Sequence, residues 1–251
     1  MFKKILLITI STILAISLLS CQNETEETSG QTPENNSGET LREQLPESIS
    51  DDAPVEQQEN IPVAVVNDAE IMLFDLFEVY QNLNRNYMEM GVDISDDGIR
   101  DQVLEEALDT LIAYEVLFQS AVKEGYTISP EKLDEEIETI KSQFESEQEF
   151  IDSLEMRQIT VEELKEDIER EMLVSDYVES TVEQPEVTEE EIMEMYDQYT
   201  ETLEEDPPEY EDLKPQLEQT VKNNKFSENV DVLIENLKED NKIEVFREEM
   251  D

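Results

Sequence analysis

The side chains that could do chemistry in this chain are almost all carboxylates. The sequence holds 67 Asp and Glu residues against 17 Lys and Arg, with a single cysteine and no histidine. Without imidazole, the chain alone cannot assemble a Ser-His-Asp or Cys-His nucleophile, or the usual zinc and non-haem iron sites. Carboxylate pairs can exchange protons with a substrate, but here they are too numerous for any pair to stand out. We therefore expect no catalytic residue, no metal ligand and no cofactor, and an enzyme is the least favoured class.

One acidic loop imitates the start of an EF-hand. Asp93, Ser95 and Asp97 place oxygen atoms at loop positions 1, 3 and 5, and Gly98 stands at position 6. Position 12 should supply a bidentate glutamate but is Leu104. The alternatives are a calcium loop and a loop whose acids cap the following helix. The missing glutamate favours the cap.

The only cysteine follows an N-terminal segment that is typical of secretion. Lys3-Lys4 form a basic start, and residues 5–19 are mostly apolar but short for a membrane span. Residues 18–21, LLSC, resemble the lipobox of bacterial lipoproteins, in which the cysteine receives a diacylglycerol. The alternative is an ordinary secreted protein with a chance cysteine. We predict that residues 1–20 are a lipoprotein signal peptide and that Cys21 is lipidated, which anchors the chain to a bacterial membrane on its extracytoplasmic side.

The segment after the cysteine has the composition of a flexible tether. Residues 22–60 contain no aromatic residue and are rich in Glu, Gln, Asn, Ser, Thr and Pro. Such a segment buries too little apolar surface to offset the entropy of ordering it. We predict a disordered acidic tether at 21–60, about 35 Å across as a coil. The remaining residues, 61–251, are predicted to form one helical domain.

The charge balance excludes whole classes of partner. A formal charge of −50 and a pI near 4.1 argue against nucleic acid and against a surface that binds anionic lipid. The five glycines form no phosphate-binding loop, so no nucleotide is expected. An acid excess of this size is typical of proteins adapted to high salt, where screening weakens self-repulsion.

The longest apolar-periodic run, 99–124, predicts a central helix around which the domain packs. The face of this helix is defined by apolar residues at helical spacing, Val103, Leu104, Ala107, Leu108, Leu111 and Ile112. Glu115 is the one acid in the apolar belt, and we expect its carboxylate to be paired or to reach solvent. Gly125 ends the helix, and Ser129-Pro130 supplies an N-cap and a first-turn proline for the next one.

Capping signals and periodicity delimit the other helices. Ser/Thr with Glu three residues later predicts capping boxes at Ser146 with Glu149, Thr160 with Glu163, and Thr188 with Glu191. The predicted helices are 73–90, 131–144, 147–157, 161–182, 189–203 and 211–239. The first is expected to bury Leu73, Leu76, Phe77, Tyr80, Leu83, Tyr87 and Met90. The last is expected to bury Leu213, Leu217, Val221, Phe226, Val230, Leu233 and Leu237, with Pro215 tolerable only near its first turn.

Two short β-rich segments lie at the two ends of the predicted domain. Residues 62–66 are β-branched and are closed by the turn-forming Asn67-Asp68, which predicts a small hairpin with residues 71–73. Residues 242–246 largely alternate between charged and apolar side chains, a pattern that is typical of a strand. Because a lone strand needs a partner, we expect the chain ends to pair. The fold class is mainly α, with a small sheet that joins the N-terminal and C-terminal strands.

This order of elements resembles the SurA/PrsA group of extracytoplasmic chaperone-foldases. The matching segments are 63–67, 108–125, 128–130, 150–154, 159–164, 187–191 and 210–246, so the resemblance covers about 61–247. Gln158 departs from it, because the family commonly has a glycine there. Family members with prolyl isomerase activity carry a parvulin domain where this chain has only residues 204–208, and the parvulin histidines have no counterpart. The resemblance therefore implies the SurA N-terminal-type chaperone module alone.

Together with the predicted lipid anchor, the resemblance leads to the hypothesis of a lipid-anchored holdase that binds unfolded or newly translocated polypeptides and lacks isomerase activity. The alternative is a lipoprotein assembly factor that holds one specific protein partner. Nine methionines offer the deformable apolar contacts that promiscuous binders use, although most methionines simply fill a core. The candidate client-binding residues are Phe74, Met88, Met193, Met195 and Tyr196.

Overall fold

A computed structural model describes residues 60–157, 159–201 and 208–246. The predicted signal peptide, Cys21 and most of the predicted tether lie outside these residues, as do Gln158 and most of the short link at 204–208. Within the described residues the chain divides into two compact units. One holds 60–119 with 238–246, and the other holds the remaining residues from 120 to 237. The long helices α2 and α7 run from one unit into the other.

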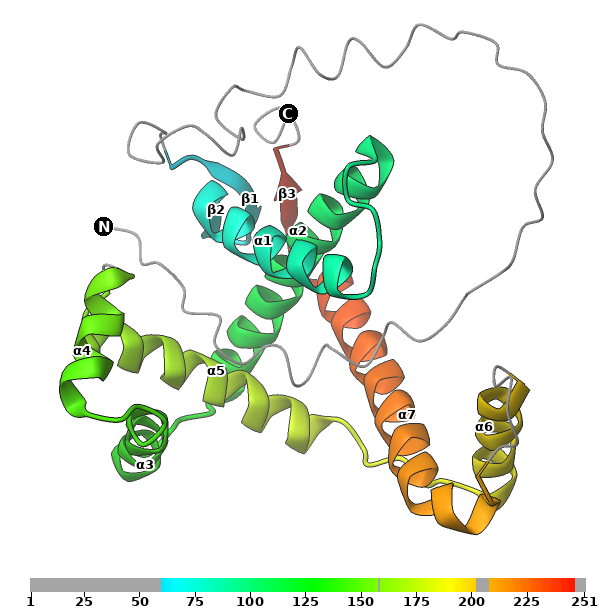
Figure 1. Cartoon of the computed structure of the whole chain (residues 1–251). Coiled ribbons are helices and arrows are strands. Elements are labelled where there is room, and N and C mark those ends of the chain that lie inside the picture. Colours follow the sequence, from blue (N-terminus) through cyan, green and yellow to red (C-terminus); the bar gives the residue numbers. More distant parts are fainter. Residues whose placement is uncertain (1–59, 158, 202–207, 247–251) are drawn as a thin grey trace, which may run out of the picture. The chain divides into compact units, whose positions relative to one another are not determined.

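The first unit contains a three-stranded antiparallel sheet (Figure 1). Its strands are β1 (Pro62–Val66), β2 (Ala69–Met72) and β3 (Ile243–Val245), in the order β2-β1-β3. Val66 lies opposite Ala69 in the hairpin and opposite Ile243 on the other side. The predicted pairing of the chain ends is therefore confirmed. The turn residue Asn67 has φ 56°, a left-handed conformation that asparagine tolerates better than most residues.

Helix α1 (Leu73–Glu89) follows β2 without a loop. Its buried residues are Leu76, Val79 and Tyr87. The predicted face was therefore partly wrong, because Val79 is buried and Met90 is 52% exposed. The Tyr87 hydroxyl donates to the Glu106 carboxylate at 2.9 Å, so this face is fixed against α2 by a polar contact as well as by packing. Gly91, with φ 80°, ends the helix as predicted.

Helix α2 (Asp97–Glu124) is the predicted central helix, and its 28 residues confirm the periodic run. Nine-tenths or more of each of the following side chains is buried: Val103, Ala107, Leu108, Leu111, Ile112, Ala113, Val116, Leu117 and Ala121. Leu104, predicted for the same face, is only half-buried. The Glu115 carboxylate accepts a hydrogen bond from Gln119 Nε2 at 2.8 Å, so the acid in the apolar belt is paired, as expected.

In the second unit, α3 (Pro130–Lys141), α4 (Glu147–Met156) and α5 (Val161–Thr181) enclose a core of their own. Its buried residues are Ile137, Phe150, Leu154, Ile159, Leu164 and Ile168. The predicted caps Ser129 and Thr160 accept from backbone N–H groups three residues on, and Thr160 forms the full box with Glu163. Ser146 caps α4, but the Glu149 carboxylate accepts from Glu145 N instead of Ser146 N. The cap at Ser146 is therefore confirmed, but the reciprocal bond of the predicted box was wrong by one residue.

The second unit also contains α6 (Glu189–Glu201) and most of α7 (Tyr210–Asp240). The α6 box forms as predicted, because Thr188 N and Oγ1 donate to Glu191 and Glu191 N donates back. Helix α7 buries Leu217, Val221, Val230 and Ile234, of which Ile234 was not predicted. The other predicted positions of α7, Leu213, Phe226, Leu233 and Leu237, are half-buried. Pro215 lies in the second turn of α7, just past the first turn where it was expected to be tolerable, and removes one backbone hydrogen bond there.

Candidate functional site

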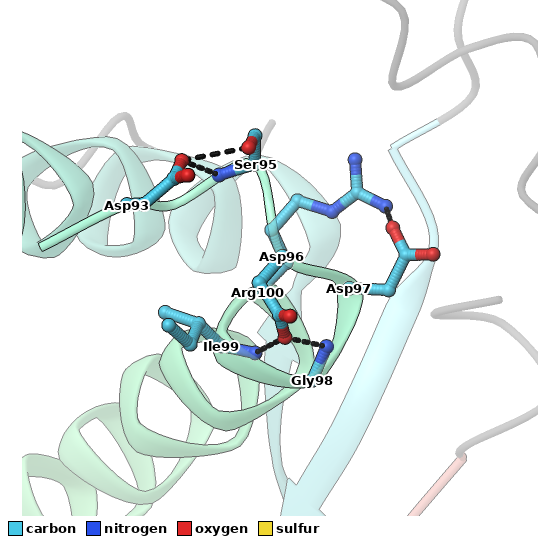
Figure 2. Close-up of polar contacts among 7 residues, drawn as sticks. All are labelled: Asp93, Ser95, Asp96, Asp97, Gly98, Ile99 and Arg100. Carbon is cyan, nitrogen blue, oxygen red and sulfur yellow. Dashed lines mark hydrogen bonds and ion pairs between the residues drawn. The ribbon is translucent and has the colours of Figure 1, made fainter. Parts of the chain in front are cut away.

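The acidic loop before α2 uses its carboxylates for local hydrogen bonds (Figure 2). Asp93 Oδ1 accepts from Ser95 N at 3.0 Å and from Ser95 Oγ at 2.6 Å, and these bonds lower the pKa of Asp93. Asp96 Oδ1 accepts from Gly98 N at 2.9 Å and from Ile99 N at 3.2 Å, which is the geometry of a helix N-cap. The prediction that this loop caps α2 is therefore confirmed.

Asp97, the third oxygen position of the EF-hand pattern, forms an ion pair with Arg100. Among the residues that the structure describes, no group of three or more His, Cys, Asp or Glu side chains is placed to hold a metal ion.

The candidate client-binding residues fall into two groups, one in each unit. In the first unit, Phe74 and Met88 lie on α1, fourteen residues and so about 21 Å apart along the helix. Phe74 is half-buried and its backbone N–H donates to Asn60 Oδ1 at 3.1 Å. Met88 is 60% exposed, and Met90 just beyond the helix end is 52% exposed. The C-terminal end of α1 thus presents two apolar side chains to solvent.

In the second unit, Met193, Met195 and Tyr196 lie on α6. Met193 is 41% exposed, while Met195 and Tyr196 are half-buried. The Tyr196 hydroxyl donates to the Pro208 carbonyl at 2.8 Å, and its ring meets Tyr210 edge to face at 5.4 Å. Tyr196 therefore holds the start of α7, whereas Met193 is available for contact.

Two lysines of α7 attach α6 by its first turn. Lys214 Nζ lies 2.6 Å from Glu189 Oε2, and the Tyr210 hydroxyl donates to Glu189 Oε1 at 2.7 Å. Lys225 Nζ lies 2.5 Å from Glu191 Oε1. These donors lower the pKa of Glu189 and bring that of Glu191 to about 2. Both carboxylates therefore remain charged at neutral pH.

Beyond this attachment, α6 carries an acidic and partly apolar outer surface. Glu189, Glu190, Met193, Glu194 and Asp197 line an open hollow of about 450 Å³. Tyr199, two residues beyond Asp197 on the same helix, is 42% exposed. The sequence prediction found Met193 but missed its acidic neighbours. The sequence does contain a signal for this surface. Ile192 marks the buried side of α6, and Met193 lies about 100° around the helix from it, on the side where the acids lie.

Two acids of α5 are withdrawn from solvent, Asp167 almost fully and Glu171 in part. Asp167 on α5 is 7% exposed. Burial, reinforced by the nearby Glu136 carboxylate, raises the pKa of Glu171 on the same helix. Glu136 belongs to α3, which packs on α5. These acids belong to the helix packing of the second unit and do not line the α6 hollow.

The fold is that of a helical module whose chain ends meet in a small sheet, with apolar side chains exposed on separate helices. Residues 46–178, more than half of the chain, match the family model described as the SurA-like N-terminal domain. The chain belongs to this family. The SurA N-terminal domain is a chaperone module, so the chain has a chaperone-type role. No curated protein matches the chain.

The family match begins at residue 46, inside the range predicted as tether, and ends within α5. In the part of the chain that the structure describes, no helix has the length and apolar character needed to cross a membrane.

Proposed function

We propose that the protein is a lipid-anchored extracytoplasmic holdase that binds unfolded or newly translocated polypeptides. The observation that carries this proposal is the exposure of apolar side chains on the helices of a SurA-like module, among which Met88 and Met193 are the candidate client contacts. Exposed apolar side chains that lie close together mark surfaces that bind other molecules, and Met88 and Met90 are two such side chains at the end of α1. Methionine suits a binder of varied sequences because its unbranched side chain adapts to the shape of its partner.

The holdase activity can be tested by light scattering. A chemically unfolded protein is diluted into buffer with or without the full-length chain, and its aggregation is followed. We expect the chain to suppress aggregation, and Met88→Gln with Met193→Gln to weaken the suppression. Met156→Gln is a matched control, because Met156 is 80% exposed but is not among the candidates. A chain that leaves aggregation unchanged would contradict the proposal.

The anchor is supported by the sequence at 18–21, where the only cysteine ends a lipobox-like tetrad. A single acyl chain gives weak membrane binding, and each further buried CH₂ adds about 0.8 kcal/mol. Cys21→Ser should therefore release the protein from membranes in a fractionation experiment. A variant that remains membrane-bound after its signal peptide is removed would show that the lipobox assignment is wrong.

We further propose that the protein has no prolyl isomerase activity and no other enzymatic activity. Helix α6 ends at Glu201 and α7 begins at Tyr210, so the intervening residues are too few for a parvulin domain. The chain also has no histidine to stand in for the parvulin histidines. Acceleration of cis/trans exchange in a proline peptide, above that of a heat-inactivated sample, would disprove this part.

The number of partners separates a general holdase from an assembly factor. Crosslinking in the native envelope should trap many different polypeptides with the holdase. A single partner recovered in fixed stoichiometry would instead identify an assembly factor built on the same module.

A further inference from the structure

Helix α6 buries little of its apolar surface. Its thirteen residues, EEEIMEMYDQYTE, contain six acids and no base. Its apolar residues are Ile192, Met193, Met195, Tyr196 and Tyr199, and of these only Ile192 is buried. An amphipathic helix normally buries its apolar side chains against a core. Within the described part of the chain, α6 buries only one of them, Ile192.

The charges of α6 are neutralised only where it meets α7. Lys214 and Lys225 pair with Glu189 and Glu191, on the first turn. The exposed carboxylates of Glu190, Glu194 and Asp197 have no ion pair or hydrogen bond within the part of the chain that the structure describes. They repel one another and are available to a cation from outside.

These three carboxylates lie together on one side of the helix. At 100° per residue, Glu190, Glu194 and Asp197 fall within about 60° of one another, and Met193 lies next to them. All four side chains line the same hollow. The hollow therefore offers an apolar contact bordered by negative charge. A lysine or arginine side chain has the same two parts, an apolar stem and a cationic end.

We propose that this outer surface of α6 is a docking site for polypeptide segments in which a lysine or arginine neighbours an apolar or aromatic residue. The proposal rests on the holdase function and adds the chemical class of its clients. The apolar residue packs on Met193, while the cation pairs with Glu190, Glu194 and Asp197.

Charge also argues against two other candidates for binding this surface, a second copy of the chain and the chain's own residues 22–60. A second copy of the chain carries the same charge of −50, and residues 22–60 of the chain are acidic themselves. Both would be repelled by the three carboxylates. An anionic client segment is disfavoured for the same reason.

The test is fluorescence anisotropy with the full-length chain in detergent micelles and three labelled peptides. The peptides share the same apolar residues, which are flanked by lysine, serine or glutamate. At low salt we expect the lysine peptide to bind roughly ten-fold more tightly than the glutamate peptide. The triple variant Glu190→Gln, Glu194→Gln, Asp197→Asn should weaken binding of the lysine peptide roughly three- to ten-fold and leave the serine peptide unchanged. Met193→Gln should weaken both.

A second triple variant controls for total charge. Glu155→Gln, Glu179→Gln and Glu218→Gln remove the same number of exposed acids from α4, α5 and α7 of the same unit. The lysine peptide should bind this control as it binds the native chain. Equal weakening by both triple variants would overturn the docking site, because the effect would then belong to net charge.

The remaining outcomes separate this proposal from the holdase function. Equal binding of the lysine and glutamate peptides would overturn the client class while leaving the holdase function standing. Binding of none of the three peptides would overturn both. Circular dichroism of each variant confirms that its helices are retained, and a variant that fails this check is replaced by its single substitutions.

Discussion

The carboxylate of Glu191 joins two helices. Its Oε1 lies 2.5 Å from Lys225 Nζ on α7, while its Oε2 accepts from Thr188 N and Oγ1 at the start of α6. Lys225 also donates to the Glu186 carbonyl at 2.7 Å, ahead of α6. One carboxylate thus completes the capping box of α6 and attaches that helix to α7. The position of the acidic surface of α6 depends on this pair.

The pair should make stability depend on pH. The Lys225 hydrogen bond, followed by those from Thr188, lowers the pKa of Glu191 from 4.5 to about 2. A lowered pKa in the folded state contributes stability that is present above the ordinary pKa of 4.5 and is lost as pH falls through about 2. Glu191→Gln should therefore melt below the native chain at pH 7 and match it near pH 2. Glu190→Gln, which removes an exposed acid with no such partner, should lack this convergence.

The hairpin turn should be sensitive to its asparagine. Asn67 Nδ2 donates to Gln119 Oε1 at 2.6 Å and to Asn241 Oδ1 at 2.7 Å, and Asn67 Oδ1 accepts from Lys242 N at 3.0 Å. Asn67→Ala removes these bonds and places alanine at φ 56°. We expect a loss of about 2–4 kcal/mol in the free energy of unfolding, measured by urea denaturation.

Two controls divide this loss between its causes. Asn67→Gly also removes the side-chain hydrogen bonds, but glycine adopts the left-handed backbone conformation without strain. This variant should therefore be about 1 kcal/mol more stable than Asn67→Ala. Asp68→Ala alters the exposed neighbouring turn residue and should change stability by less than about 0.5 kcal/mol. If the Asn67→Ala variant unfolds at the same urea concentration as the native chain, the turn does not hold β1 and β3 together.

The core of the second unit should depend on Phe150. This side chain is 1% exposed, and its ring meets Phe144 edge to face at 5.4 Å. Phe150→Ala should cost about 3–5 kcal/mol because it leaves a cavity among α3, α4 and α5. Met156→Ala, on the same helix but 80% exposed, should cost less than about 0.5 kcal/mol. Similar melting temperatures for the two variants would contradict the assignment of this core.

Salt should stabilise the protein. The chain has a charge of −50, the described helices expose many of its acids, and few basic residues are present to neutralise them locally. The Debye length falls from about 10 Å at 0.1 M to about 3 Å at 1 M, so added salt weakens the repulsion. We expect the melting temperature to rise from 0.05 M to 2 M NaCl, about the range over which screening becomes complete, with much of the rise below 1 M. A flat curve would mean that the acids are compensated by their neighbours.

The sequence by itself determined the features that act over a few residues. The Thr160 and Thr188 boxes, the turn at Asn67-Asp68 and the stop at Gly91 all form where they were predicted. Each depends on a backbone group and a side chain no more than a few positions apart, so neighbouring residue types are enough to specify it. The pairing of β1 with β3 was also predictable, because the strand segment at 242–246 needed a partner and the other strand candidates lay together at the start of the domain.

Only the tertiary structure decided which parts of each helix are covered. Val79 and Ile234 are buried and Met90 is exposed, although periodicity alone gave the opposite or no indication. Periodicity in the sequence defines which residues share one apolar face of a helix. Whether each of them is buried depends on how much of that face the neighbouring helix covers. In the same way, nothing near Glu191 in the sequence points to Lys225, which lies 34 positions away. Among 67 acids, the few that find a lysine are chosen by helix packing, and the acids left without one give α6 its charged outer surface.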